Sequence, residues 1–537
     1  MTQTLLRKWT ELTPDKVFAV FESGTQWSYS DALDLSWRVG AALTKLGVKP
    51  GQPVLSFLPN GEEAVLAFFG ANAAGAVYAP INVAYRGAIL QHALNLPRGE
   101  LLVIHADLYD RLVGLDLPHI KTVVVVGDIA TQVLSVDHVL WQRLSSEAAI
   151  EPPAICARKP TDDMVYIYTS GTTGPSKAVR CSYRHHEIYA DWYGRELDET
   201  DRCFLCLPMF HVGGTGWLYT MLVRGGSIAV VERFRTEDFW PAVKRMGATT
   251  CTFMAAMARF LFRQPATPDD ADNPIRVACL VPYIPETEEF GKRFDVALFT
   301  GFAMSEVPGP LRTDVGTSNM NRAGVAASPD WQLRLFDADG YDVPQGSIGE
   351  LVVRHTEPAG ITRGYLHMPE ATAEAWTDGW FHTGDLFKID AEGNYHFVDR
   401  NKDALRRRGE NISSIEVEAE INQHPAVSES AIIGVPSTEM EDDVFAYVVK
   451  KAGANVSHEE IFDFLVDRMP HFMVPRYIEF IDQLPRTPNY KVAKGELRKL
   501  ERGQQTWDRQ QAGIKLSSKG VMKSQPTIEP ANLAANG

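Results

Sequence analysis

The chain lacks the long apolar runs that cross membranes or direct secretion. No segment of its 537 residues approaches the roughly 20 apolar residues of a membrane-spanning helix. Charged residues are scattered through the first twenty positions and interrupt the apolar stretch that a signal peptide requires. We therefore expect a cytoplasmic protein without integral membrane association.

The chain is also poor in cysteine, with six residues in all. This number does not indicate a disulfide framework in a chain of this length. Cys203 and Cys206 have the spacing of a redox motif, but they lie in an apolar run without a second pair. We expect them to be buried structural thiols rather than a metal or redox site.

Basic residues are outnumbered, since 53 Lys and Arg face 68 Asp and Glu, which gives a formal charge of −15. This balance argues against bulk attraction to nucleic acid or anionic lipid, so no nucleic-acid partner is expected. It does not argue against a phosphate ligand, because local amides and one or two cations are enough to build such a site.

Short apolar strands alternate with helices through most of the chain. Residues 53–59, 62–73 and 77–82 read as a strand, a helix and a strand, and similar strands recur at 101–104 and 122–126. This alternation predicts an α/β fold with parallel-rich sheets covered by helices. A chain of this length also exceeds one compact core, so at least two domains are expected.

The pattern changes near Asp399, where a strongly charged stretch has the composition of a linker or hinge. A small α+β unit follows, in which Ser457 and Glu460 have the spacing of a helix-capping box. We expect a large N-terminal domain over residues 1–400, a small mobile C-terminal lid domain over 401–515, and a disordered polar tail over 516–537.

The most informative stretch is VYIYTSGTTGPSKAV at residues 165–179, where an apolar strand leads into glycines, hydroxyls and a lysine. Glycines allow successive backbone N–H groups to point at one anion, and Lys177 adds a positive charge. The predicted polyphosphate contacts are Thr169, Ser170, Gly171, Thr172, Thr173, Gly174 and Lys177. A polar surface turn is the alternative. The ATPase pattern G-x-x-x-x-G-K-[ST] does not fit, because Ala178 follows the lysine.

The full string resembles the signature of the adenylate-forming superfamily, which comprises acyl-CoA ligases, luciferases and the adenylation domains of peptide synthetases. That family usually has glycine where this chain has Ala178. The segment PMFHVGG at 208–214 resembles the family segment whose histidine stands at the mouth of the acyl pocket, so the resemblance assigns His211 there. Within the superfamily, RRRGENIS and the later WDR most resemble the carnitine/crotonobetaine-CoA and bile-acid-CoA ligases.

Two further segments resemble the nucleotide-binding motifs of the family. In TGFAMSE at 300–306, the resemblance implies that Phe302 stacks on adenine, Ser305 contacts phosphate and Glu306 holds magnesium, as a carboxylate suits that cation. In GWFHTGD at 379–385, it implies that Asp385 accepts hydrogen bonds from the ribose hydroxyls. Arg400 would be a second ribose contact.

The C-terminal motifs follow in the chain order expected for the family. Lys402 falls at the hinge position of the family, and Gly409 at the glycine that lets the pantetheine arm of coenzyme A pass. LPRTPNYKVAK resembles the terminal lysine motif, which makes Lys491 the candidate adenylation lysine and Lys494 the next best. The resemblance covers the chain to about residue 510.

The resemblance implies an AMP-forming acid–CoA ligase that uses ATP, Mg²⁺ and coenzyme A as co-substrate, with a homodimer allowed. Two alternatives stay open: an adenylating enzyme with another acceptor, such as a carrier-protein thiol or an amine, and a non-catalytic nucleotide-binding homologue. The carboxylic acid is not identified by the sequence. We expect His185 and His186, which follow the phosphate loop, to lie on a helix surface.

Overall fold

The structure is a computed structural model. It describes residues 1–523 apart from 131–132, 147–157, 170–174, 285, 318–321, 338, 401–404, 408–409, 413, 438–441, 486–491, 493, 501–502, 504 and 518–519. The chain divides into two compact units. The first comprises Met1–Val83, Gln91–Thr169 and Ser176–Asn401, and the second comprises Ala84–Leu90, Ser170–Pro175 and Lys402–Gly537.

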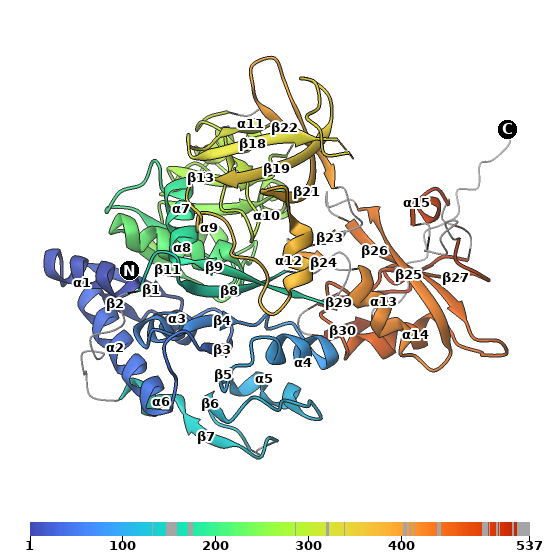
Figure 1. Ribbon diagram of the computed structural model, residues 1–537, viewed down its shortest axis with the longest axis horizontal. Coiled ribbons are helices and arrows are strands. Elements are labelled where there is room, and N and C mark those ends of the chain that lie inside the picture. The colour runs from blue at the N-terminus through green and yellow to red at the C-terminus, as the bar shows by residue number, and fades with distance from the viewer. Residues whose placement is uncertain are drawn as a thin grey trace. The chain divides into compact units, whose positions relative to one another are not determined.

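The first unit contains two seven-stranded sheets (Figure 1). One has the order β7-β6-β5-β3-β4-β8-β9, and only its last pair, β8 and β9, is antiparallel. Its strands are β3 (Pro53–Phe57), β4 (Val77–Pro80), β5 (Leu101–His105), β6 (Thr122–Val126), β7 (Asp137–Leu140), β8 (Asp163–Thr169) and β9 (Lys177–Ser182). The run at β6 is buried throughout, as expected for a strand covered on both faces.

The other seven-stranded sheet has the order β14-β13-β12-β10-β11-β1-β2 and is parallel except for the β1–β2 pair. Its strands are β1 (Val17–Phe21), β2 (Gln26–Ser28), β10 (Arg202–Leu205), β11 (Ser227–Val230), β12 (Thr250–Met254), β13 (Val277–Val281) and β14 (Ala297–Phe299). The predicted parallel-rich α/β architecture is confirmed.

A single apolar core joins these two sheets through the helices that pack against both. The helices are α1 (Thr2–Leu12), α2 (Tyr29–Lys45), α3 (Glu62–Ala73), α7 (Tyr183–Tyr193) and α8 (Val212–Arg224). Helix α3 is buried on nearly all sides and lies against α2 (Figure 1). A Cβ at Gly70 would lie 2.3 Å from Val39 Cγ1, so glycine is required for this close approach.

The remaining helices before residue 401 are shorter, and the first of them is divided between the two units after Leu90. They are α4 (Gly87–Asn95), α5 (Ala106–Tyr109), α6 (Trp141–Ser145), α9 (Phe239–Met246), α10 (Ala255–Phe262), α11 (Thr287–Phe294) and α12 (Pro369–Ala375), with a 3₁₀ turn at Asp110–Leu112. Helices α9, α10 and α11 share a second apolar core with the β10–β14 region.

A third sheet, of eight antiparallel strands, completes the first unit. Its strands are β15 (Gly301–Phe302), β16 (Leu311–Arg312), β17 (Arg322–Ala326), β18 (Trp331–Phe336), β19 (Gly349–His355), β20 (Trp376–Thr377), β21 (Trp380–Ile389) and β22 (Tyr395–Arg400). The first strand carries Phe302, and β21 carries Asp385.

The second unit is a small α+β structure around a four-stranded sheet, as expected. Its elements are β23 (Leu405–Arg407), β24 (Glu410–Ile412), α13 (Ser414–Asn422), β25 (Val427–Pro436), β26 (Asp442–Lys450), α14 (His458–Val466), β27 (Tyr477–Phe480), α15 (Lys494–Leu497), β28 (Trp507–Asp508), β29 (Ile514–Ser517) and β30 (Gly520–Lys523). The predicted capping box is present, because Ser457 accepts from the N–H of Glu460 and the Glu460 carboxylate accepts from the N–H of Ser457.

Two expectations for the second unit need correction. The disordered tail does not begin at residue 516, because β29 and β30 pair as a hairpin in which Ile514 and Leu516 are buried. The charged stretch before residue 408 is also not wholly exposed. Leu405 and Arg407 are buried, and Arg407 forms an ion pair with Asp443 at 3.1 Å.

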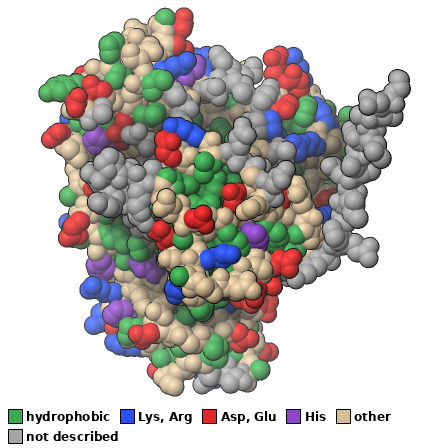
Figure 2. Space-filling view, turned by 90° about the vertical axis from the view of Figure 1, so that its right-hand side faces the viewer, with side chains coloured by type: hydrophobic (Ala, Val, Ile, Leu, Met, Phe, Trp, Pro, Cys, Tyr) green, Lys and Arg blue, Asp and Glu red, His purple; other side chains and the backbone are tan. Residues whose placement is uncertain are grey.

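Both signs of charge are interspersed among the described side chains on the face drawn in Figure 2. The net charge of −15 is therefore not gathered into one acidic field on that face. Within the described residues, none of the helices combines the length and the apolar character that crossing a membrane demands.

Candidate functional site

The predicted phosphate loop connects the two strands of a β-hairpin. Thr169 at the end of β8 is paired with Lys177 at the start of β9. Ser170, Gly171, Thr172, Thr173 and Gly174 lie outside the described residues. The two ends of the predicted loop are thus held opposite each other by the sheet, and Lys177 stands at its exit.

Lys177 is connected to Glu306 through the ring of Tyr365. The Nζ of Lys177 lies 4.5 Å from the centre of that ring, as in a cation–π contact. The hydroxyl of Tyr365 donates to Oε1 of Glu306 at 2.9 Å. Burial raises the pKa of Tyr365, and the nearby Glu306 carboxylate raises it further. The phenol therefore keeps its proton and acts as a donor at neutral pH.

The backbone beside β9 positions Tyr365. The N–H of Arg180 donates to the carbonyl of Gly364 at 3.1 Å, and the N–H of Leu366 donates to the carbonyl of Ala178 at 2.9 Å. Tyr365 is directly opposite Val179 in this antiparallel arrangement. Directly opposed residues project to the same face of a sheet, so the pairing places Tyr365 on the side that Lys177 and Cys181 also share.

A tight turn carries Ser305 and Glu306. Met304 and Val307 exchange two backbone hydrogen bonds across it, at 3.1 and 3.0 Å. The N–H of Thr362 donates to the carbonyl of Glu306 at 2.8 Å, and the hydroxyl of Tyr189 donates to the carbonyl of Met304 at 2.7 Å. Glu306 is buried, so the carboxylate predicted to hold magnesium has a fixed direction.

Glycine is needed just before this turn. A Cβ at Gly301 would lie 2.2 Å from the carbonyl oxygen of Leu311, the neighbouring strand residue. The close approach allows Phe302 to begin the turn from the edge of the third sheet, where its ring lies 5.1 Å from that of Phe387.

Helix α7 packs beneath the turn, and its two histidines are a correction. We expected His185 and His186 on a helix surface, but both are fully buried. Burial lowers the pKa of His185 to about 3, partly offset by the backbone of Ser305 and Glu306. The physical reason is the helical stripe of aromatic and histidine side chains, which forms the inward face of α7.

The same helix also supports the segment that carries His211, the second predicted site motif. Nε2 of His186 lies 3.1 Å from Oγ1 of Thr215, whose N–H donates to the carbonyl of His211 at 3.2 Å. His211 is the N-cap residue of α8 and is partly buried, with its ring 4.8 Å from that of Phe210. Helix α7 thus supports both His211 and the turn that carries Glu306.

Asp385 lies in the middle of β21 and is buried. Its N–H donates to Oγ1 of Thr383 at 3.2 Å. The register pairs Asp385 with Arg400 of β22, whose backbone alone is described. Phe387, two residues further along β21, contacts Phe302. The structure therefore brings together the predicted adenine and ribose residues on one sheet.

Glu306 fits the magnesium role by its donor chemistry. Mg²⁺ is usually bound by one or two carboxylates together with the phosphates of its substrate. Among the described residues, no group of three or more His, Cys, Asp or Glu side chains could form a metal cage. A single buried carboxylate matches a cation that arrives with a nucleotide.

Three predicted residues, Lys402, Gly409 and Lys491, lie outside the described residues. The second choice for the adenylation lysine is placed, and it is engaged within its own unit. Nζ of Lys494 donates to Oγ of Ser414 at 2.6 Å and pairs with Glu418 at 2.7 Å. These contacts give Lys494 a structural role between α15 and α13.

Sequence reasoning missed Tyr365, Tyr189 and His186. In the segment RGYLHMPEAT around Tyr365, the charged and histidine residues are not in a pattern that marks a nucleotide site. For α7 a signal existed, because large aromatic and histidine side chains recur at the helical spacing of a buried face.

A family profile described as AMP-binding enzyme matches residues 6–366, and a second, described as AMP-binding enzyme C-terminal domain, matches residues 416–491. Among curated proteins, a crotonobetaine/carnitine–CoA ligase of Citrobacter koseri is 29% identical, over 92% of this chain and 99% of its own length. A sulfoacetate–CoA ligase of Cupriavidus necator is 28% identical, over 90% and 94%.

Solved structures show the same fold. An o-succinylbenzoate CoA synthetase of Bacillus subtilis has a TM-score of 0.79 at 22% identity, covering 93% of this chain and 98% of its own. An amide bond synthetase of Marinactinospora thermotolerans has a TM-score of 0.77 at 23% identity, covering 92% and 99%. The first profile alone spans more than half of the chain. The chain therefore belongs to the AMP-binding enzyme family.

Proposed function

We propose that this enzyme activates a carboxylic acid with ATP as an acyl-adenylate and transfers the acyl group to coenzyme A. The reaction is that of an AMP-forming acid–CoA ligase, the activity named for its curated relatives. The observation that carries the proposal is the connection from Lys177 through Tyr365 to Glu306 at the end of the β8–β9 hairpin.

The first half-reaction must bring a carboxylate to the α-phosphate of ATP, one anion against another. Lys177 and the backbone of residues 169–174 would neutralise the polyphosphate. Magnesium held by Glu306 would supply further positive charge to the phosphate oxygens. Tyr365 keeps the Glu306 carboxylate oriented. Such fixed charges stabilise the transition state without reorganising during the reaction.

The nucleoside end would lie over the third sheet. Phe302 offers an aromatic face for adenine, and the buried Asp385 offers acceptor oxygens for the ribose hydroxyls, with Arg400 beside it in the register. Ser305 would contact phosphate from the turn before Glu306. Holding both ends of ATP aligns its innermost phosphorus for attack, which lowers the entropic barrier.

The second unit would complete the site as a lid. Lys491 would bridge the attacking carboxylate and the α-phosphate, and Lys402 would be the pivot for the change to thioester formation, with Gly409 beside the pantetheine arm. His211 would stand at the mouth of the acyl pocket. We further propose residues 1–400 and 401–515 as the functional domains, a cytoplasmic location and a homodimer as the assembly.

The acceptor distinguishes the main rival. The fold is shared with a protein named as an amide bond synthetase, so an amine acceptor is compatible with the architecture. Omitting coenzyme A from an assay separates the two. With coenzyme A as acceptor, AMP release without it should fall to a single turnover. A rate that is unchanged without coenzyme A would contradict the proposal.

Lys491→Ala tests the division of labour, with Lys494→Ala as the matched lysine control. The first variant should lose acid-dependent pyrophosphate exchange and still form thioester from supplied acyl-adenylate. The second should retain exchange, although it is less stable because Ser414 and Glu418 lose their partner. Loss of both half-reactions in Lys491→Ala would contradict the assignment.

A further inference from the structure

A groove of about 700 Å³ lies between helix α12 and the strand β9, in the first unit. Thr372 and Trp376, from α12 and its C-cap, are among the lining residues, and so are Arg180, Arg363 and His367, which we call the cationic wall. A volume of this size is typical of a small-molecule site. Two of its lining residues, Thr362 and Tyr365, also hold Glu306 in the adenylation site proposed above.

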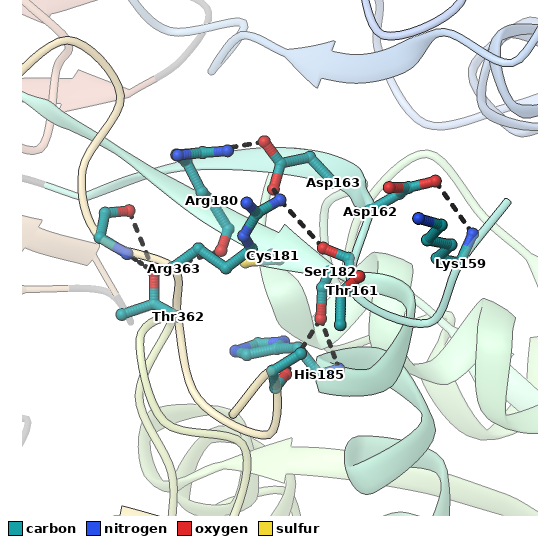
Figure 3. A network of polar contacts seen from close by, with 12 residues as sticks. Lys159, Thr161, Asp162, Asp163, Arg180, Cys181, Ser182, His185, Thr362 and Arg363 are labelled. Carbon is teal, nitrogen blue, oxygen red and sulfur yellow. Dashed lines mark hydrogen bonds and ion pairs between the residues drawn. The ribbon is translucent and has the colours of Figure 1, made fainter. Parts of the chain in front are cut away.

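The cationic wall has an excess of positive charge. Arg180 and Arg363 share one carboxylate, the buried Asp163, at 2.8 and 3.4 Å. The two guanidinium groups carry two positive charges and the carboxylate carries one negative charge, so a net positive charge remains. Figure 3 shows one end of the Arg180 guanidinium directed at Asp163 and the other directed away from it.

Both arginines have guanidinium N–H donors that make no hydrogen bond within the described part of the chain. The Nε of Arg180 donates to Asp163, while its two terminal nitrogens make no hydrogen bond within the described part of the chain. Arg363 uses Nη1 for the carbonyl of Thr161 and for Asp163, and its Nε and Nη2 make no hydrogen bond with any residue that the structure describes. Planar forks of this kind suit phosphate or carboxylate groups.

Among the described residues the lining itself contains no acidic side chain, although Glu374 acts electrostatically on Tyr365. Burial lowers the pKa of His367, and the nearby positive charges of Arg98 and Arg180 lower it further. The two acidic residues of α12, Glu370 and Glu374, are not among the residues that line the groove. In a chain with a formal charge of −15, this groove is a local exception.

The part of the lining that comes from α12 and its C-cap carries an aromatic ring. Trp376 is half-buried and packs edge-on against Phe381 at 5.4 Å, which fixes its indole. Thr372 is a turn away on the same face of α12, and its hydroxyl is already used by the N–H of Tyr365 and the carbonyl of Met368. This part of the lining therefore offers a flat contact surface rather than hydrogen bonds.

We propose that the groove binds a small organic anion, with its phosphate or carboxylate on Arg180 and Arg363 and its aromatic body against Trp376. Tyr365 lines the groove and also holds Glu306. A bound anion would thus lie one side chain away from the predicted magnesium carboxylate.

The test uses 1-naphthyl phosphate, titrated into the full chain by calorimetry, with 1-naphthoate as the carboxylate counterpart and inorganic phosphate as the probe without an aromatic body. Arg363→Gln should weaken binding of 1-naphthyl phosphate about tenfold, as for the loss of a charge-assisted hydrogen bond. Arg363→Lys should lose less, since it keeps the charge without the fork. Trp376→Leu should weaken the naphthyl probes and leave inorganic phosphate unchanged.

Two controls locate the bound probe. Arg224→Gln removes an arginine whose side chain is 29% exposed, as is that of Arg180, and which also pairs with one carboxylate. Lys177→Met removes the lysine of the predicted nucleotide site. Both should bind the probe as the parent chain does. Unchanged binding by Arg363→Gln and Trp376→Leu, or loss of binding in Lys177→Met alone, would overturn the proposal. Thermal unfolding verifies that each variant is folded, and Arg363, 40% exposed, tolerates replacement better than Arg180.

Discussion

Glu306 and Asp385 are two buried carboxylates of one proposed nucleotide site, 5% and 6% exposed, and they are held in different ways. Glu306 lies in a turn and is oriented by contacts from Tyr365, Thr362 and the neighbourhood of Tyr189. Asp385 lies within a strand, next to an irregularity in the β19–β21 pairing at residues 383–385, and its pairing with Arg400 of β22 sets its direction. A carboxylate on a turn depends on individual side chains, whereas one on a strand depends on a whole sheet.

Glu306→Gln should have the largest effect, because it removes the charge and keeps the shape. An amide oxygen can still accept from Tyr365, so the turn should stay in place while metal binding is lost. We expect pyrophosphate exchange to fall by about 10³-fold, the upper range for a lost electrostatic contact. The measurement is exchange at saturating acid and ATP, with thermal unfolding as the control. A loss below tenfold would remove Glu306 from the metal role.

Asp385→Asn should come next. A carboxylate that accepts from ribose hydroxyls contributes through charge-assisted hydrogen bonds, so the KM for ATP should rise about 10- to 100-fold with a smaller change in kcat. Steady-state kinetics with ATP as the varied substrate measures this. If kcat falls while KM is unchanged, Asp385 acts on the reacting phosphorus instead.

Tyr365→Phe tests whether the two carboxylates, Glu306 and Asp385, are held in different ways. The ring and its contact with Lys177 remain, and only the hydrogen bond to Glu306 is lost. We expect about a tenfold loss of exchange activity, with a larger requirement for Mg²⁺. The matched change at the other carboxylate is Thr383→Val, which removes an acceptor from the N–H of Asp385. It should cost less than threefold, because the strand itself still holds Asp385. Equal losses in the two variants would abolish the distinction.

Protonation of the buried histidines should lower stability at low pH. Burial lowers the pKa of His185 to about 3 and that of His186 well below its ordinary value of 6.5. In the unfolded chain both take up protons near pH 6.5, so folding is fully favoured above that pH and loses stability as the pH falls toward 3. Each histidine contributes a slope of about 1.4 kcal/mol per pH unit in this window.

Urea unfolding between pH 8 and 5 measures that slope through the transition midpoint. His185→Gln should flatten it, and His119→Gln, at a partly exposed position, should not. An identical pH dependence in the parent chain and in His185→Gln would contradict the role of the buried ring.

The order of elements could be predicted from the sequence because the strands are short apolar runs between clear helices. The strand, helix and strand at 53–82 were expected nearly residue by residue, and they form a parallel β3–α3–β4 unit. The hairpin of β8 and β9 was not expected, since antiparallel pairing depends on which neighbour a strand finds and not on its own residues.

The residues of the candidate site also fall into those that could be predicted from the sequence and those that could not. Lys177, Phe302, Ser305, Glu306 and Asp385 could be proposed as site residues because they lie in segments that resemble family motifs, and their roles stay predictions. Tyr365 was not, because its role arises only when residues 362–366 lie beside β9, nearly 200 positions away in the chain. The burial of His185 and His186 was misjudged because the aromatic spacing of α7, which marks a buried helix face, was not considered.

The thiols of the chain have a practical consequence for labelling chemistry. Cys181, Cys203, Cys206, Cys251 and Cys279 are all buried. Burial raises the pKa of each of them, so they resist maleimides and other reagents that attack thiolates. Replacement of Cys156 alone would then give a background on which one introduced surface cysteine in each unit can carry a dye. Pairs of such dyes would test the proposed rotation of the second unit during turnover.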